Sequence, residues 1–184
     1  MTIYISPNPG KTSANEIALR AAQILMNHGA AVLMCEQPRT SCSTAGVVYL
    51  PLEECLEQAD VILTIGGDGT ILHMAKAATR RGVPLLGVNI GTMGFMAELE
   101  STELEKLSML ATGEFTTEKR MMLDVTVQRS RDILFHDICL NDAVITKGAI
   151  ARIVHLSVKC DGVQAMECGG DGVIVATPTG STAY

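Results

Sequence analysis

Apolar and polar residues follow one pattern in the first part of this 184-residue chain and another in the second. In the first part, short apolar runs at residues 3–5, 31–35, 61–65 and 84–88 alternate with stretches that have helical spacing. Such an alternation predicts a parallel sheet covered by helices. The run at 61–65 is apolar almost throughout and rich in β-branched residues, so it predicts a central strand buried on both faces.

The expected helices are recognised by their spacing and by their ends. Two pairs, Ser13 with Glu16 and Thr102 with Glu105, have the spacing of a capping box and predict helix starts. A further helix is expected over residues 71–81, with two arginines in its last turn. The expected helices end at Gly29, Gly82 and Gly113, and a short one covers residues 52–58.

After about residue 120 the spacing changes to a period of two. Leu123, Val125 and Val127 alternate with polar residues, which predicts a half-exposed strand. Similar short runs lie at residues 133–135, 138–146, 153–160 and 173–176. The predicted fold class is therefore α/β, with a parallel-sheet domain over residues 1–118 and a mostly β domain over residues 119–184.

Composition and charge argue against several classes of function. The chain is 47% hydrophobic, enough for a core, and 14 Lys+Arg against 20 Asp+Glu give a net charge of -6. Negative charge, few aromatic residues and no tryptophan argue against a nucleic-acid partner. The longest uncharged stretch, residues 82–97, is too short and too rich in glycine to span a membrane. Because the N-terminus also lacks the features of a signal peptide, we expect a cytoplasmic protein.

The residues that follow the central run are the first candidates for chemistry. Gly66-Gly67-Asp68-Gly69-Thr70 lies where a buried strand becomes a helix, the corner at which open α/β sheets bind ligands. Glycines there let backbone N–H groups approach phosphate oxygens, so Gly66, Gly67 and Thr70 are candidate phosphate-binding residues. Asp68 would repel phosphate unless it accepts a proton from an attacking hydroxyl, bonds a ribose hydroxyl or helps to hold a divalent cation. The alternative is a plain turn in which Asp68 caps the helix.

Two further clusters lie in the second part. Asn141-Asp142 interrupts an apolar run, and Gly169-Gly170-Asp171-Gly172 precedes a strand that leads into the hydroxyl-rich segment 177–184. Each alone is ordinary turn chemistry, but with the glycine corner they favour a nucleotide pocket. The triplet Gly10-Lys11-Thr12 resembles the end of a phosphate-binding P-loop, but Ile5 stands where that motif requires its first glycine. Lys11 is therefore interpreted as a loop residue that could touch phosphate. No metal site made by protein ligands is predicted.

These motifs resemble those of the NAD kinase family, whose members phosphorylate the ribose hydroxyl of NAD to make NADP. The resemblance covers almost the whole chain. It rests on Gly66 to Thr70, Asn89 to Phe95, Leu140-Asn141-Asp142, and Asp171-Gly172 followed by Thr177 to Tyr184. The Gly-Gly-Asp-Gly-Thr motif is shared with diacylglycerol, sphingosine and phosphofructokinase-type kinases, whereas the segment 177–184 is far more specific.

The resemblance implies roles for individual residues. Asp68 would accept the proton of the ribose 2′-hydroxyl, and Asp171 would hold the nicotinamide end. The other implied nucleotide contacts are Gly69, His73, Asn141, Asp142, Arg152, Thr182, Ala183 and Tyr184. The phosphoryl donor would be ATP or polyphosphate with a divalent cation such as Mg²⁺, and members are usually homodimers or homotetramers.

The chain departs from the family pattern in one respect, because family members continue well beyond the tyrosine at which it stops. We therefore expect an incomplete β domain and weak or no activity from these residues alone. Two alternatives remain open at this point. The chain could be a lipid or sugar kinase that uses the same glycine corner, or a nucleotide-binding module without catalysis.

Overall fold

The structure, a computed structural model, describes residues 1–36, 44–91, 94–148 and 152–182. The chain folds into two compact units, Met1–Glu118 and Lys119–Tyr184. The first combines a parallel sheet with helices, and the second contains antiparallel strands, as the predicted fold class requires. Among the described residues, no helix has both the length and the apolar character needed to cross a bilayer.

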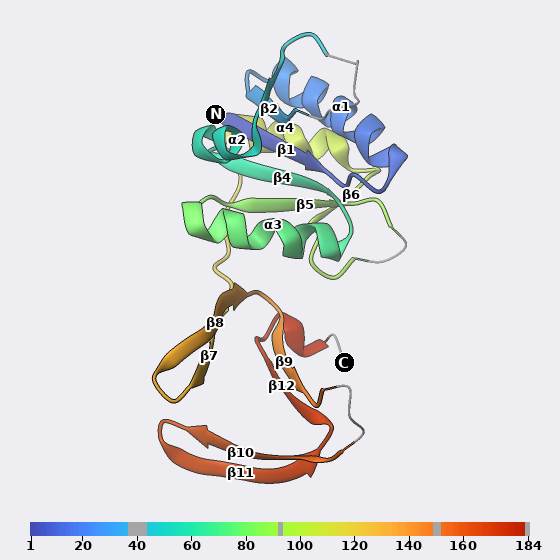
Figure 1. Cartoon of the computed structure of the whole chain (residues 1–184). Helices are drawn as coiled ribbons and strands as arrows, with labels where there is room; N and C mark the ends of the chain where they lie inside the picture. The colour runs from blue at the N-terminus through green and yellow to red at the C-terminus, as the bar shows by residue number, and fades with distance from the viewer. Residues whose placement is uncertain (37–43, 92–93, 149–151, 183–184) are drawn as a thin grey trace. The chain divides into compact units, whose positions relative to one another are not determined.

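The first unit is built on one six-stranded sheet in which every neighbouring pair is parallel (Figure 1). Its strands are β1 (Thr2–Pro7), β2 (Ala31–Cys35), β3 (Val47–Leu50), β4 (Val61–Gly66), β5 (Leu85–Asn89) and β6 (Leu99–Glu100). The spatial order is β3-β2-β1-β4-β5-β6, so the direction of winding reverses between β1 and β4. The carboxyl ends of strands at such a reversal are where open α/β sheets bind ligands. The predicted central strand is confirmed, since every residue of β4 is buried.

Helices cover both faces of this sheet. They are α1 (Thr12–Asn27), α2 (Leu52–Gln58), α3 (Asp68–Arg81) and α4 (Leu107–Thr112), and a 3₁₀ turn at Leu104–Lys106 precedes α4. One face of the sheet, with Ile3 and Leu63, packs against α1 and α4, and the other, with Tyr4 and Ile62, packs against α2 and α3. Because successive strand residues point to opposite faces, the central strands contribute to both apolar clusters.

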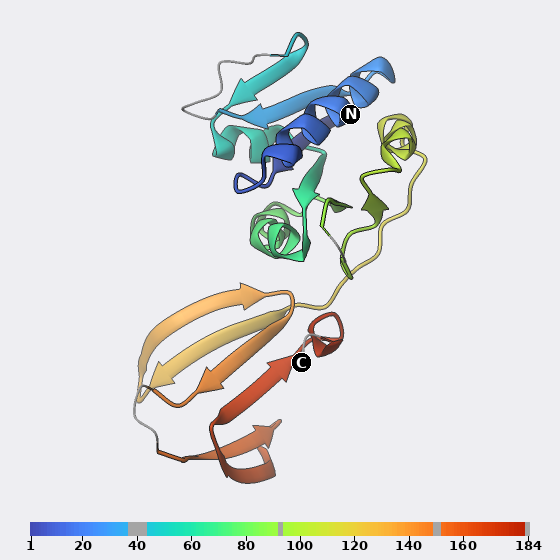
Figure 2. The ribbon, with the colours of Figure 1, turned by 90° about the vertical axis from the view of Figure 1, so that its right-hand side faces the viewer.

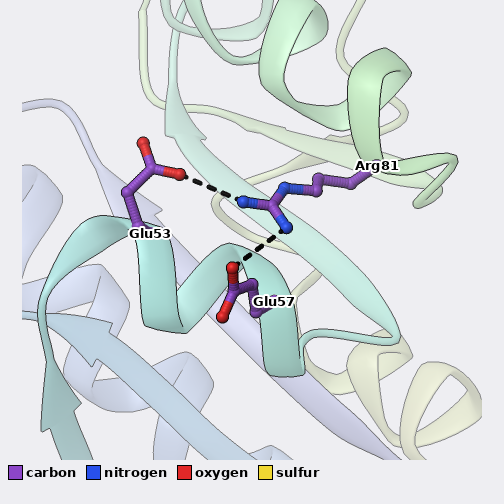
Figure 3. A network of polar contacts seen from close by, with 3 residues as sticks. All are labelled: Glu53, Glu57 and Arg81. Carbon is purple, nitrogen blue, oxygen red and sulfur yellow. Dashed lines mark hydrogen bonds and ion pairs between the residues drawn. The ribbon is translucent and has the colours of Figure 1, made fainter.

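The helix after β4 ends as the sequence predicts but begins three residues earlier, at Asp68. Gly82 follows it in the left-handed conformation with φ 67°, which glycine adopts without strain. At this end Arg81 donates to Glu53 (3.1 Å) and Glu57 (3.3 Å) of α2 (Figure 3). The ion pairs therefore tie α2 to the end of α3 that lies furthest from Asp68.

Both predicted capping boxes are wrong. The N-cap of α1 is Lys11, without a side-chain cap, because the helix begins at Thr12 and already contains Ser13 in its first turn. Near Thr102 the chain forms the 3₁₀ turn instead, and the carboxylate of Glu103 accepts the N–H of Glu100 (3.0 Å). The same carboxylate accepts the ammonium of Lys106 at 2.6 Å, and this bond lowers the pKa of Glu103.

The second unit consists of three antiparallel strand pairs (Figure 2). The pairs are β7 (Leu123–Arg129) with β8 (Asp132–Cys139), β9 (Asp142–Thr146) with β12 (Gly172–Ala176), and β10 (Val154–Cys160) with β11 (Val163–Gly170). The sequence did not predict β11, although Asp161 and Gly162 both have positive φ, as a two-residue hairpin turn requires. Leu140 is the one apolar side chain of this unit that is buried among the described residues.

Candidate functional site

The glycine corner joins the carboxyl ends of β1 and β4. A Cβ at Gly66 would lie 2.1 Å from Oγ1 of Thr70, so only glycine lets the threonine side chain fold back onto the strand end. Oγ1 of Thr70 accepts a hydrogen bond of 3.0 Å from Nδ2 of Asn8, in the loop after β1. The backbone N–H of Asn8 in turn donates to the carbonyl of Ile65 (2.8 Å). The corner is thus fixed at the point where the winding of the sheet reverses.

The carboxylate of Asp68 lies in this corner and is held by the loop that follows β5. Oδ2 accepts the N–H of Phe95 at 3.1 Å, and Oδ1 accepts the N–H of Met96 at 3.2 Å. The alternative in which Asp68 caps its own helix is wrong, because the N-cap of α3 is Gly67 and has no side-chain cap bond. Each carboxylate oxygen keeps a further lone pair. Asp68 is therefore oriented by the backbone and can still accept a proton or a hydroxyl hydrogen.

The loop after β5 is anchored by a buried amide. Asn89 is 1% exposed, and its Nδ2 donates to both carboxylate oxygens of Glu100, at 3.1 Å each. Its Oδ1 accepts the N–H of Gly91 at 2.9 Å. A Cβ at Gly94 would approach Cγ of Asn89 to 3.2 Å and Oδ1 of Asp68 to 3.3 Å. The glycine therefore lets the loop pack directly over both side chains.

Lys11 brings a positive charge to the same edge. Its Nζ lies 3.8 Å from the position that a Cβ of Gly91 would take. Across the described part of the chain, the Lys11 side chain has no carboxylate within ion-pair distance. The ammonium is exposed beside a loop that also contacts Asp68, so it can pair with an anionic ligand at this edge.

The remaining candidates of the first unit line the start of α3. Gly67 and Gly69 have open space where a Cβ would stand. The N–H of Thr70 already donates to the carbonyl of Gly67 (2.9 Å), so the N–H groups of Asp68 and Gly69 are the ones at this corner that can donate to an anion. His73 is exposed and lies five residues after Asp68, about 140° further around the helix. The structure therefore does not put His73 on the side of α3 that carries Asp68.

A second polar cluster, in the second unit, joins two segments that are distant in the sequence. Thr177 is 1% exposed, and its Oγ1 donates to the carbonyl of Leu140 (2.6 Å) and accepts the N–H of Gly180 (3.1 Å). Its N–H donates to the carbonyl of Asn141 at 2.8 Å. A Cβ at Gly180 would lie 2.1 Å from that carbonyl oxygen, so this close approach requires glycine. The Leu-Asn-Asp segment and the start of segment 177–184 are thus held together.

Asn141 has an unsatisfied side chain. Its Oδ1 is buried and has no hydrogen-bond partner among the described residues. Buried polar atoms are almost always paired, so an orphan acceptor needs an explanation, and a bound donor group is one. Asp142, the next residue, is half-buried and begins β9. An amide oxygen and a carboxylate are therefore available to a ligand at one end of this strand pair.

Asp171 lies at the other end of that pair. In the β9·β12 register, Asp142 faces Ala176 and Thr146 faces Gly172, so Asp171 and Asn141 lie beyond opposite ends of the pair, about 20 Å apart. Oδ1 of Asp171 accepts Nζ of Lys147 at 2.7 Å, an ion pair that the sequence did not predict. The structure does not bring Asp171 together with Asn141.

The other predicted residues of the second unit are dispersed. Arg152 is exposed just before β10, and Thr182 belongs to the 3₁₀ turn Gly180–Thr182. Ala183 and Tyr184 lie outside the described residues. In the described ranges, no group of three histidine, cysteine or acidic side chains is arranged to hold a metal ion.

Comparison with known proteins points to one family. The family model for the ATP-NAD kinase N-terminal domain matches residues 3–115, and that for the C-terminal domain matches residues 140–184. The chain is 40% identical over its whole length to the NAD kinase of Natranaerobius thermophilus and 39% identical to that of Solibacter usitatus. It spans 64% and 63% of the lengths of these two relatives.

A solved structure shares the fold. A yeast NADH kinase in complex with NADH matches all of this chain with a TM-score of 0.85 and 23% identity, and the match covers 59% of that protein. The first family model alone accounts for more than half of the chain. The chain belongs to the ATP-NAD kinase family.

Proposed function

We propose that the protein transfers the terminal phosphoryl group of ATP, or of polyphosphate, to the 2′-hydroxyl of the adenosine ribose of NAD, giving NADP. One observation carries this proposal: at the reversal of the sheet, two backbone N–H groups orient the carboxylate of Asp68. The relatives at 40% and 39% identity are NAD kinases, which favours this acceptor over a lipid or a sugar. Since the chain spans less than two thirds of those relatives, the activity is proposed for the protein that contains it.

In the proposed mechanism, Asp68 accepts the proton of the 2′-hydroxyl while the ribose oxygen bonds to the terminal phosphorus. The bond from that phosphorus to its bridging oxygen breaks, and ADP leaves with the electron pair. Such transfers need positioning and charge neutralisation more than covalent work by the protein. General-base assistance of this kind contributes about 10² to 10⁴ in rate.

The donor phosphates are proposed to bind beside this carboxylate. Lys11 supplies a positive charge near Gly91, and the first N–H groups of α3 supply donors, with Gly66, Gly67 and Thr70 shaping the corner. We assign Mg²⁺ to the substrate, as the complex that it forms with the donor's phosphates. The residues fit this assignment, because Mg²⁺ in such complexes takes only one or two carboxylates from the protein, and Asp68 offers one.

NAD is proposed to bind the polar cluster around Thr177. The unpartnered Oδ1 of Asn141 supports this, since a ribose hydroxyl or the adenine amino group would supply the missing donor. Asp142, next to Asn141, and Thr182, in the turn that begins at Gly180, are proposed to contact the same nucleotide. Gly69, His73, Arg152, Asp171, Ala183 and Tyr184 stay predicted contacts that rest on the family resemblance.

Assembly into a homodimer or homotetramer is also proposed. The strand pairs of the second unit expose apolar side chains, and burial of such surface drives association. The most exposed of them are Ile133, Leu134, Phe135 and Val163. The mass of the protein in solution, measured by light scattering, tests this assembly.

A cytoplasmic location and the absence of nucleic-acid partners stay predictions from the sequence.

The test of the proposed function is direct. The full protein that contains this chain is incubated with ATP, Mg²⁺ and NAD, and the nucleotides are analysed by mass spectrometry. We expect NAD to gain one phosphate and the product to serve an NADP-specific dehydrogenase. Parallel incubations with diacylglycerol and with a hexose phosphate test the rival kinases. Phosphate on either of these, or on no acceptor at all, would contradict the proposal.

A further inference from the structure

We propose that Asn89 and Glu100 form a positioning pair for Asp68: their side-chain contact closes the base of the loop whose backbone holds the catalytic carboxylate. The inference rests on the proposed function. Neither side chain reaches the reacting atoms in this proposal. Both act through the N–H groups of Phe95 and Met96, which donate to Asp68 at 3.1 and 3.2 Å.

The pair lies where the loop leaves the sheet and returns to it. Asn89, the last residue of β5, and Glu100, the last of β6, are register partners. The backbone carbonyl of Asn89 also accepts the N–H of Ser101 at 3.1 Å. The two bonds from the amide to Glu100 therefore fix both ends of the intervening loop at one point.

The side-chain amide of Asn89 also contacts the loop directly. Its Oδ1 accepts the N–H of Gly91, and Gly94 packs so close that a Cβ would meet Cγ of Asn89 at 3.2 Å. Among the described residues, the hydrogen bonds of this buried amide thus go to the loop and to Glu100. A shift of the Asn89 side chain must move the loop, and the loop carries the donors that orient Asp68.

Residue 89 needs a donor toward Glu100 and an acceptor toward Gly91, and the amide of Asn89 supplies both. Asn89→Asp keeps the acceptor for Gly91 but sets a carboxylate about 3 Å from the carboxylate of Glu100, and like charges so close repel. Glu100→Gln in the same chain restores an N–H donor, now on residue 100. The double variant therefore exchanges the two groups and rebuilds the contact.

The experiment compares Asn89→Asp, Glu100→Gln and the double variant in the full protein, with kcat and the KM values for NAD and ATP as readouts. A misplacement of about 1 Å can cost about 10²-fold in rate, so we expect Asn89→Asp to lose about ten- to a hundredfold in kcat. Both KM values should change less than about threefold, and the double variant should recover most of the kcat. Glu98→Gln, an exposed change within the same loop, is the matched control and should leave kcat unchanged.

A second readout does not depend on activity. Hydrogen exchange at the amides of Phe95 and Met96 should be faster in Asn89→Asp and slow again in the double variant. Unchanged exchange and kcat in Asn89→Asp, or a double variant that folds but recovers neither, would overturn the inference. Failure of the wild-type protein to phosphorylate NAD would instead contradict the proposed function, and the exchange measurement would still decide whether the pair holds the loop.

Discussion

The two units of this chain bury their apolar residues to very different extents. In the first, one continuous sheet is covered by helices on both faces, and all the buried apolar side chains described in the structure except Leu140 belong to it. In the second, three strand pairs expose residues such as Phe135 and Val163. The first unit carries its own core, whereas the second relies on backbone pairing and on the polar cluster around Thr177.

The two units therefore position their functional residues in different ways. Asp68 is placed by a buried strand, a helix start and a loop anchored by Asn89, all within the first unit. Asn141 is placed by local bonds between two segments of the second unit. We therefore expect changes in the first unit to affect the chemical step and the global stability, and changes in the second to affect mainly the binding of NAD.

The largest effect is expected from Asp68→Asn. The amide keeps the size of the side chain but cannot accept the hydroxyl proton, so kcat should fall by about 10² to 10⁴. Steady-state assays with NAD and ATP measure this, and Glu98→Gln serves as a nearby control that alters charge without touching the corner. A variant that keeps most of its turnover would show that Asp68 does not accept the hydroxyl proton.

The next largest difference should appear between isoleucines of the two units. Ile62→Ala empties a fully buried site in β4 and should cost about 2 to 5 kcal/mol in the free energy of unfolding. Ile174→Ala, at a residue that is 44% exposed in β12, should cost less than about 1 kcal/mol. Urea unfolding of both variants measures the contrast. Equal losses would show that the second unit has a core comparable to the first.

Stability at alkaline pH should also depend on the first unit. Burial raises the pKa of the Cys55 thiol to about 11, above its ordinary value of 9.0. Below pH 9 the thiol is neutral in both states; as the pH rises toward 11 the unfolded chain ionises first, so this stabilisation is lost. Cys55→Ala should flatten that decline, because the alanine side chain has no proton to lose.

The control for this pH dependence comes from the other unit. Cys160 is exposed at the end of β10, and Cys160→Ala should leave the alkaline decline unchanged. Urea unfolding at pH 8, 9, 10 and 11 provides the comparison. The same slope in the wild type and in Cys55→Ala would contradict the role of the buried thiol.

A smaller effect is expected from Thr177→Val, which removes the hydroxyl but keeps the shape of the side chain. The carbonyl of Leu140 and the N–H of Gly180 lose their partner, at a cost of about 1 to 3 kcal/mol. We expect a higher KM for NAD with little change in the KM for ATP. Thr177→Ser, which retains the hydroxyl, should restore NAD binding. An unchanged KM for NAD in Thr177→Val would show that this cluster is not part of the acceptor site.

The smallest effect is expected from Lys11→Met. Loss of one charged contact to the donor phosphates should raise the KM for ATP by about tenfold, equivalent to about 1.4 kcal/mol. Lys11→Arg should retain most of the affinity. Replacing ATP with polyphosphate in the same assay shows which donor depends on this charge. A KM for both donors that stays at the wild-type value would exclude Lys11 from the donor site.

Sequence patterns predicted the parts of the fold that have strong local signals. The buried run of β4, the glycine after α3 and the alternation in β7 follow from burial and backbone conformation. The short strands β3 and β6 and the polar strand β11 were missed because their residues carry little apolar periodicity. The capping boxes failed because α1 begins one residue before Ser13 and because a 3₁₀ turn with N-cap Glu103 forms near Thr102.

The site was predictable as a set of residue types but not as a set of contacts. The glycine corner marked Asp68, yet nothing local indicates that N–H groups 27 and 28 residues later hold its carboxylate. The same is true of the pair Asn89 with Glu100, which depends on the pairing of β5 with β6. Asn141 and Thr177 could be linked only through the family resemblance, because their contact joins segments 36 residues apart.

The most direct test of this account is the affinity of Asp68→Asn for NAD, measured by calorimetry in the full protein beside its turnover. If the first unit supplies the chemical step and the second supplies the acceptor site, the dissociation constant should stay within about threefold of the wild type while turnover falls by about 10² or more. Loss of NAD affinity to the same degree as turnover, or turnover that persists, would contradict the division of roles between the two units.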